Sequence, residues 1–197
     1  MSLTPVSNAS FIPAHQQVLH FRKGDQPTLA SNEWQIWSGN QDEGANITLP
    51  DLEHGAHKVL VPFTWWLEHR HEADVKAKAN KGQIGVWFAT DDDILKHADV
   101  IEAGKTVWPL VAAHFPIFRD GRSFSTAALL RNRFAWQGEI RAIGDVLIDQ
   151  LLQGARVGFD SFALRPDQNL DVALKQFDLY SVTTQNSWRD KRATLSI

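Results

Sequence analysis

The centre of the chain alternates short apolar runs with longer segments whose apolar residues recur at helical spacing. Three of the apolar runs predict strands buried on both faces, at residues 106–115, 139–143 and 158–164. Between the first two, Ala127, Leu130 and Phe134 are spaced so that they share one buried face of a helix. Strands and helices that alternate in this way form a parallel sheet with right-handed crossovers.

Two further apolar runs extend this pattern toward the N-terminus. Residues 58–63 and 83–90 predict strands, and each is followed by a segment with helical spacing. We therefore predict an α/β domain over residues 58–197, with a parallel sheet of about four to five strands built from βα units. The pattern leaves two arrangements open, an open three-layer sheet and a partial barrel.

Residues 1–57 are polar and rich in turn signals, unlike the rest of the chain. Residues 17–23 and 33–37 alternate apolar and polar side chains, which is typical of half-buried strands. We predict that residues 1–57 form a small β-rich arm outside the α/β domain.

The composition excludes several kinds of site. The chain of 197 residues has no cysteine, which rules out disulfides, thiolate zinc sites and cysteine-ligated clusters or haem within it. We therefore expect no cofactor bound covalently or through cysteine, so that any redox chemistry would use a dissociable cofactor. The acidic triplet Asp91–Asp93 is interpreted as a helix cap, and no metal site is predicted.

Charge and hydropathy limit the possible cellular locations and binding partners of the protein. The formal net charge of -3 argues against a basic face for nucleic acid. No stretch approaches the roughly 20 apolar residues of a membrane span. The first residues lack a basic segment followed by an apolar core, so we expect a cytoplasmic protein without a membrane contact. The eight tryptophans predict core filling or a contact between subunits, and a homo-oligomer is expected.

Polar and charged residues follow the strands of the predicted sheet, at the edge where parallel α/β proteins bind ligands. Between Thr106 and Leu174 all seven basic residues other than histidine are arginines, whose planar fork pairs with two oxygens of an oxyanion. Gly121 suits a tight turn, and the helix start behind it adds N–H donors. The residues singled out for an anion or substrate site are Arg119, Asp120, Gly121, Arg122, Ser125, Arg141, Asp145, Asp149 and Gln150.

A second interpretation of the same residues remains open. The arginines could instead pair with Asp120, Asp145 or Asp149 in a network that ties the loops together. The chain lacks G-x-G-x-x-G, a P-loop, a nucleophile elbow and H-E-x-x-H, so no catalytic residue is nominated.

One stretch resembles a bacterial family, domain of unknown function 934. The resemblance rests on F-x-DGR-x-FS from Phe118, LLR-x-R from Leu129, GE-x-RA-x-GDVL-x-DQL from Gly138 and GFD-x-F from Gly158. The family is encoded beside assimilatory sulfite reductase and carries the label of an oxidoreductase of sulfite reduction. This chain has Ser123 where many relatives carry glycine.

The resemblance implies a role in sulfate or sulfite assimilation, which the composition constrains. The sirohaem and iron–sulfur centre of sulfite reductase needs cysteine ligands, so this chain is not that catalytic subunit. We expect an accessory protein that contacts sulfite reductase or a related sulfur-assimilation enzyme. The alternatives are a small anion-binding enzyme or oxidoreductase that uses a dissociable cofactor, and a structural oligomeric scaffold.

Overall fold

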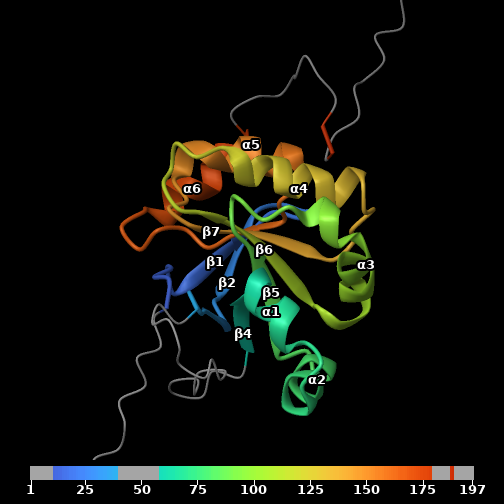
Figure 1. Ribbon diagram of the computed structural model, residues 1–197. Coiled ribbons are helices and arrows are strands. Elements are labelled where there is room, and N and C mark those ends of the chain that lie inside the picture. Colours follow the sequence, from blue (N-terminus) through green and yellow to red (C-terminus); the bar gives the residue numbers. More distant parts are fainter. Residues whose placement is uncertain (1–10, 40–57, 179–186, 189–197) are drawn as a thin grey trace, which may run out of the picture.

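The computed structural model describes residues 11–39, 58–178 and 187–188, which form a mixed α/β structure around one mostly parallel sheet (Figure 1). The sheet has eight strands in the order β2-β1-β8-β7-β6-β5-β4-β3, so the prediction of four to five strands is not confirmed. The strands are β1 (Gln17–His20), β2 (Thr28–Ser31), β3 (Trp34–Ile36), β4 (Lys58–Pro62), β5 (Ile84–Phe88), β6 (Leu110–Phe115), β7 (Glu139–Gly144) and β8 (Ser161–Phe162).

Strands β4 to β8 pair in parallel, as the alternating pattern predicts. Strand β3 also pairs in parallel with β4, although it comes from the segment expected to form an arm. The helices are α1 (Phe63–His69), α2 (Ala73–Asn80), α3 (Ala98–Val107), α4 (Arg122–Asn132), α5 (Leu151–Val157) and α6 (Leu170–Leu174). Short 3₁₀ turns stand beside them, η2 (Ile94–His97), η3 (Ile148–Gln150) and η4 (Lys175–Asp178). None of the helices in the described ranges is long and apolar enough to cross a membrane.

The first three strands belong to the main sheet. Strand β1 pairs antiparallel with β2 and with β8, whereas β3 pairs parallel with β4 at the opposite edge. Val18 and Leu19 on β1 are both fully buried, because each face of that strand packs on a different core. The expected separate arm is therefore not confirmed, and residues 1–10 and 40–57 lie outside the described ranges.

The sheet is curled. Its two edge strands, β2 and β3, are joined by only Asn32 and Glu33, and three peptide links span at most about 11 Å. The segment before β1 bridges the same gap, since the amide of Ile12 donates to Ile36 and that of His15 to Leu164. The two edges therefore approach each other, as the barrel-like alternative requires and an open three-layer sheet does not.

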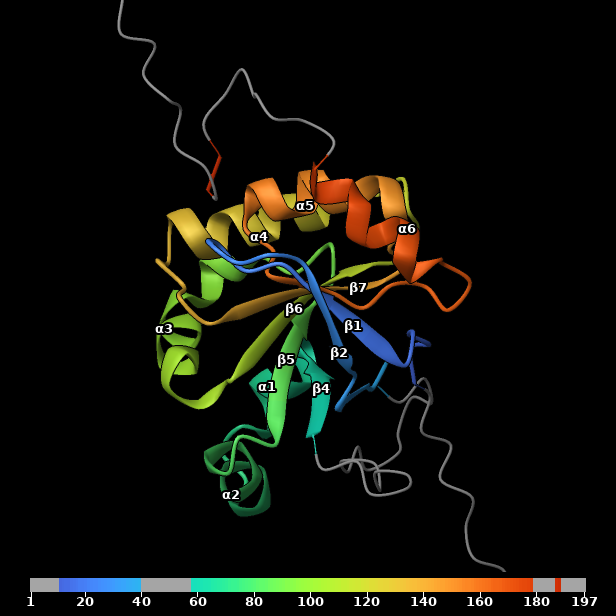
Figure 2. The ribbon, with the colours of Figure 1, turned by 180° about the vertical axis from the view of Figure 1, so that it is seen from behind.

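Two apolar cores result from the curl. The outer one lies between the sheet and the helices, and α4, α5 and α6 cover this face side by side (Figures 1 and 2). The inner one lies on the concave face and includes Trp34, Leu60, Trp87 and Leu110. Seven of the eight tryptophans are buried, so core filling, one of the two predicted roles, accounts for most of them.

Candidate functional site

The loops after β6 and β7 meet at the carboxyl edge of the sheet, and Gly144 allows them to approach. Its φ of +91° lies in the left-handed region, and the amide of the next residue, Asp145, donates to the carbonyl of Phe115. A Cβ at position 144 would stand 2.4 Å from that carbonyl and 2.6 Å from the imidazole of His114. Glycine is needed here for both conformation and space.

Asp145 and Gln150 fix the backbone of the loop that follows β6. The amide of Phe118 donates to Oδ2 of Asp145 at 2.9 Å, and its carbonyl accepts from Nε2 of Gln150 at 2.6 Å. Gln150 is itself held by the amide of Leu147. Ile117 and Phe118 are 43% and 51% exposed. The backbone of this loop is thus fixed by hydrogen bonds, while its apolar side chains are exposed to solvent.

The arginines of this edge are paired with aspartates. Arg165 bridges Asp145 and Asp167 at 2.8 and 2.6 Å, and Arg122 forms a fork on Asp120 with a closest approach of 2.6 Å. The Arg165–Asp145 pair joins the loops after β7 and β8, whereas the Arg122–Asp120 pair lies within a single loop. Gly121 has φ of −85° and does not use the conformational freedom expected of it. Neither Ser123 nor Ser125 caps α4, and the hydroxyl of Ser123 donates instead to the carbonyl of His114.

Arg122 is expected to set the charge state of Asp120. Its hydrogen bonds hold the pKa of Asp120 at about 2, below the ordinary value of about 3.9. The pairing therefore stabilises the fold above about pH 4, and this contribution is lost as the pH falls toward 2. We expect Arg122→Ala to raise the pKa of Asp120 toward 3.9, measured by carboxyl-carbon NMR titration.

Asp167 provides the matched control for this titration. Arg165 holds its pKa at about 2 by the same kind of hydrogen bond, and Arg122 does not contact it. The pKa of Asp167 should therefore stay unchanged in Arg122→Ala. A value near 2 for Asp120 in that variant would contradict the pairing.

The other predicted site residues are not brought into this network. Arg119, Ser125 and Asp149 are exposed, and among the described residues their side chains form no hydrogen bond or ion pair. Arg141 lies on the concave face, three positions before the end of β7. It is therefore not at the carboxyl edge of the sheet, where Arg122 lies. It binds Glu139 and Ser161 at 2.8 and 3.0 Å.

Sequence reasoning missed the group around Arg141. Register places His20 opposite Ser161, and Ser161 opposite Arg141, in one row across three strands. Glu139 lies two positions before Arg141 on β7 and so faces the same side of the sheet. That alternation could have linked the two β7 residues, but His20 comes from the segment expected to form an arm.

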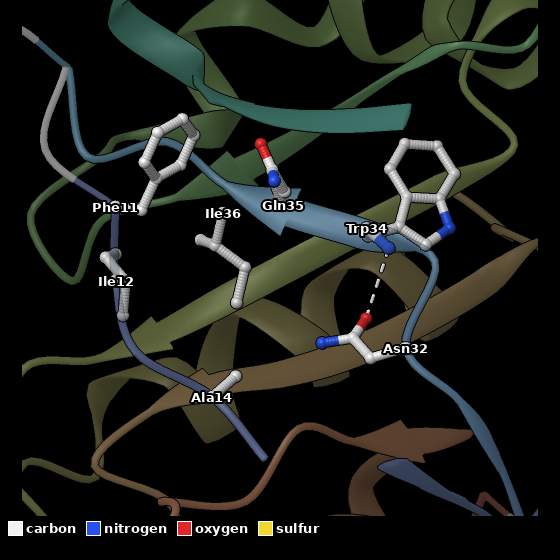
Figure 3. Close-up of a pocket in the computed structure, with 7 residues that line it drawn as sticks. All are labelled: Phe11, Ile12, Ala14, Asn32, Trp34, Gln35 and Ile36. Atoms are coloured by element: carbon white, nitrogen blue, oxygen red, sulfur yellow. Dashed lines mark hydrogen bonds between the residues drawn. The ribbon is translucent and has the colours of Figure 1, made fainter. Parts of the chain in front are cut away.

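A small cavity of about 200 Å³ lies where the sheet edges approach (Figure 3). Segment 11–14 lines one side and β3 the other, and the carbonyl oxygen of the Asn32 side chain accepts from the amide of Trp34 at 3.2 Å. Its walls contain no titratable side chain. The cavity offers packing space and no acid–base chemistry.

The acidic triplet closes a turn after β5. Asp92 accepts from the amide of Ala89 at 2.7 Å, and Asp93 pairs with Lys96 at 3.2 Å. Burial raises the pKa of Asp92. Within the described residues no cluster of three or more histidine, aspartate or glutamate side chains has an arrangement suited to a metal ion.

The fold and this edge define an α/β protein with a curled, mostly parallel sheet whose carboxyl-end loops are tied by arginine–aspartate pairs. The family described as bacterial protein of unknown function (DUF934) matches residues 85–195, more than half of the chain. The chain belongs to this family. No curated protein and no solved structure matches it.

Proposed function

We propose that this protein is an accessory protein of sulfite assimilation that binds sulfite reductase through residues 116–119, here named the edge loop. The observation that carries the proposal is the fixed backbone of Phe118, whose amide and carbonyl are both bound while its ring is exposed. Exposed apolar surface on a folded protein is one of the features that mark sites of contact with other proteins. The edge loop is therefore suited to binding another protein.

The surroundings of the edge loop favour a protein ligand. Ile117 and Phe118 are adjacent in sequence, and the next residue, Arg119, is also exposed. Aromatic residues and arginine are the side chains enriched at the energetic centres of interfaces. An apolar pair with an arginine beside it therefore fits a partner surface with an apolar depression and an acidic rim.

The fixed backbone increases the affinity that these side chains can provide. Ordering a flexible loop on binding opposes association, and a loop that is already ordered avoids most of that cost. Asp145 and Gln150 hold the loop directly, and Arg165 holds Asp145. The predicted anion-site residues thus support recognition indirectly.

The ion pairs weigh against an oxyanion site at this edge. A sulfite or sulfate ion at Arg122 would have to displace Asp120, which occupies the fork of the guanidinium with three hydrogen bonds. At Arg165 it would have to displace two aspartates. The choice of sulfite reductase as partner follows from the family resemblance, in which the two are encoded side by side.

The edge loop is tested by polar substitution. We expect the double variant Ile117→Ser, Phe118→Ser to bind purified sulfite reductase at least about tenfold more weakly, because an aromatic hot spot contributes about 2 kcal/mol or more. Binding is measured by isothermal titration calorimetry. Both side chains are exposed, so the fold should survive.

Val172→Ser is the matched control, since Val172 is 45% exposed on α6 and lies outside the edge loop. Its affinity for sulfite reductase should equal that of the wild type. Unchanged affinity in the double variant would contradict the proposal. A change in oligomeric state alone would instead favour the scaffold, and a sulfite-induced rise in melting temperature that Arg122→Ala abolishes would favour an anion-binding enzyme.

A further inference from the structure

A second cavity, of about 700 Å³, opens on the concave face of the sheet near the starts of β7 and β8. The concave face is apolar along β3 to β6, where Trp34, Leu60 and Trp87 lie. It is polar at the end of β1 and near the starts of β7 and β8, where His20, Glu139, Arg141 and Ser161 lie. Two of these residues, His20 and Glu139, line the cavity. A cavity of this size matches small-molecule sites in general.

Glu139 is held as a carboxylate with one oxygen engaged. Burial alone raises its pKa, but the charge of Arg141 and the hydroxyl of Ser161 outweigh burial and lower it. Oε1 accepts from Ser161 at 2.5 Å and from Arg141 at 2.8 Å. Oε2 accepts no hydrogen bond from the described residues, and its nearest cation is Nη2 of Arg22 at 3.7 Å. Glu139 thus has an oxygen available for a donor.

Two further groups line the same cavity with open hydrogen-bonding capacity. Arg22 is 56% exposed and contacts Glu139 only through the long pair just described, so its guanidinium is open to another anion. His20 approaches Glu139 no closer than 3.9 Å, which is too long for a hydrogen bond. Burial lowers the pKa of His20, so its ring is neutral at neutral pH and has one donor and one acceptor.

The wall of the cavity carries charges of both signs. Arg22 lines it with a cation, Glu139 and Asp25 line it with carboxylates, and Arg141, which does not line the cavity, pairs with Glu139. A ligand with a single charge would use only one of the two signs. A small zwitterion satisfies both signs. Its cationic end suits Oε2 of Glu139, and its carboxylate suits Arg22.

We propose that this cavity binds a free α-amino acid, with its ammonium group on Glu139 and its carboxylate on Arg22. Glu139 is fixed by Arg141 and Ser161, so it provides a preformed anchor. The exposed side chain of Arg22 binds the carboxylate. His20 lines the same cavity and provides one further hydrogen bond. The site is independent of the edge loop, which belongs to the opposite end of the parallel strands.

The proposal is tested with the full-length protein and each of the standard L-amino acids. We expect at least one of them to raise the melting temperature and to bind in isothermal titration calorimetry. Arg22→Met should weaken this binding at least about tenfold, because it removes a charge-assisted contact. Glu139→Gln should weaken it to a similar degree. Arg119→Met is the matched control and should bind as the wild type does, since Arg119 is an exposed arginine at the other end of the sheet.

Arg22→Met keeps the test valid if Glu139→Gln fails to fold, because Arg22 is exposed and has no other partner in the described ranges. The amine and the carboxylic acid that correspond to the best amino acid are also titrated, and each should bind at least about tenfold more weakly. The proposal is overturned if no amino acid binds. It is equally overturned if Arg22→Met binds as the wild type does, or if the carboxylic acid alone binds as tightly as the amino acid.

Discussion

Replacing Arg131 with methionine is expected to lower the free energy of unfolding by about 3–5 kcal/mol, the usual effect of removing one partner of a buried ion pair. The side chain of Arg131 is 1% exposed although it lies near the end of α4. Its partner Asp160 would remain as a buried carboxylate without a counter-charge. Chemical denaturation followed by tryptophan fluorescence measures the change.

The size of this effect follows from the contacts of Arg131. Besides Asp160, the guanidinium donates to the carbonyls of Trp136, Gly138 and Gly158 at 2.6 to 2.9 Å. Asp160 in turn accepts from the amide of Ile140. One side chain therefore satisfies buried backbone groups from the loop before β7 and the turn before β8. Methionine fills the volume but leaves those carbonyls without donors.

Arg133→Met is the matched control. Arg133 is exposed two residues later, and its replacement should change the free energy of unfolding by no more than about 0.5 kcal/mol. Equal effects of the two substitutions would show that the buried contacts of Arg131 do not stabilise the fold. Arg131→Lys should remain strongly destabilised, because an ammonium group cannot make the same set of planar contacts.

Gly144→Ala is expected to destabilise the protein by about 3 kcal/mol or more. A left-handed conformation costs a non-glycine residue about 1–2 kcal/mol, and forcing atoms into a packed site adds about 1–3 kcal/mol. The added Cβ would meet a backbone carbonyl, which cannot rotate away as a flexible side chain can. The measurement is the free energy of unfolding by chemical denaturation.

Gly24→Ala separates the two contributions. Gly24 has nearly the same φ, +92°, but a Cβ there would meet nothing within 4 Å. Its destabilisation should therefore stay near the conformational cost of about 1–2 kcal/mol. If both variants lost the same stability, the close approach of Gly144 to Phe115 and His114 would not matter. Gly144→Ala should also weaken partner binding, because the displaced Asp145 no longer holds Phe118.

Part of the candidate site could be predicted from the sequence. Asp145 and Gln150 were expected at the carboxyl edge, because residues that follow parallel strands share that edge. Their action on the backbone of Phe118 could not be predicted, since it depends on the distance between two loops. Arg141 was assigned to the same edge by its residue type, but strand register places it on the concave face with Glu139.

Arg131 is another residue whose role could not be predicted from the sequence. It lies in the last turn of α4, where a cation interacts favourably with the helix dipole without any further partner. The structure buries it because the turn before β8 brings Asp160 against α4. Neither the period of the helix nor the charge of the residue indicates that approach, which depends on how three separate segments pack.

The sequence by itself determined the alternation of strands and helices from Lys58 onward, the parallel pairing and the absence of cysteine chemistry. These properties depend on local periodicity and on residue types, which are readable without a partner segment. Only the tertiary structure decided that β1 to β3 join the sheet and that its edges approach each other across Asn32 and Glu33. Strand order, register and curl are set by contacts between residues far apart in the chain, which local periodicity does not reveal.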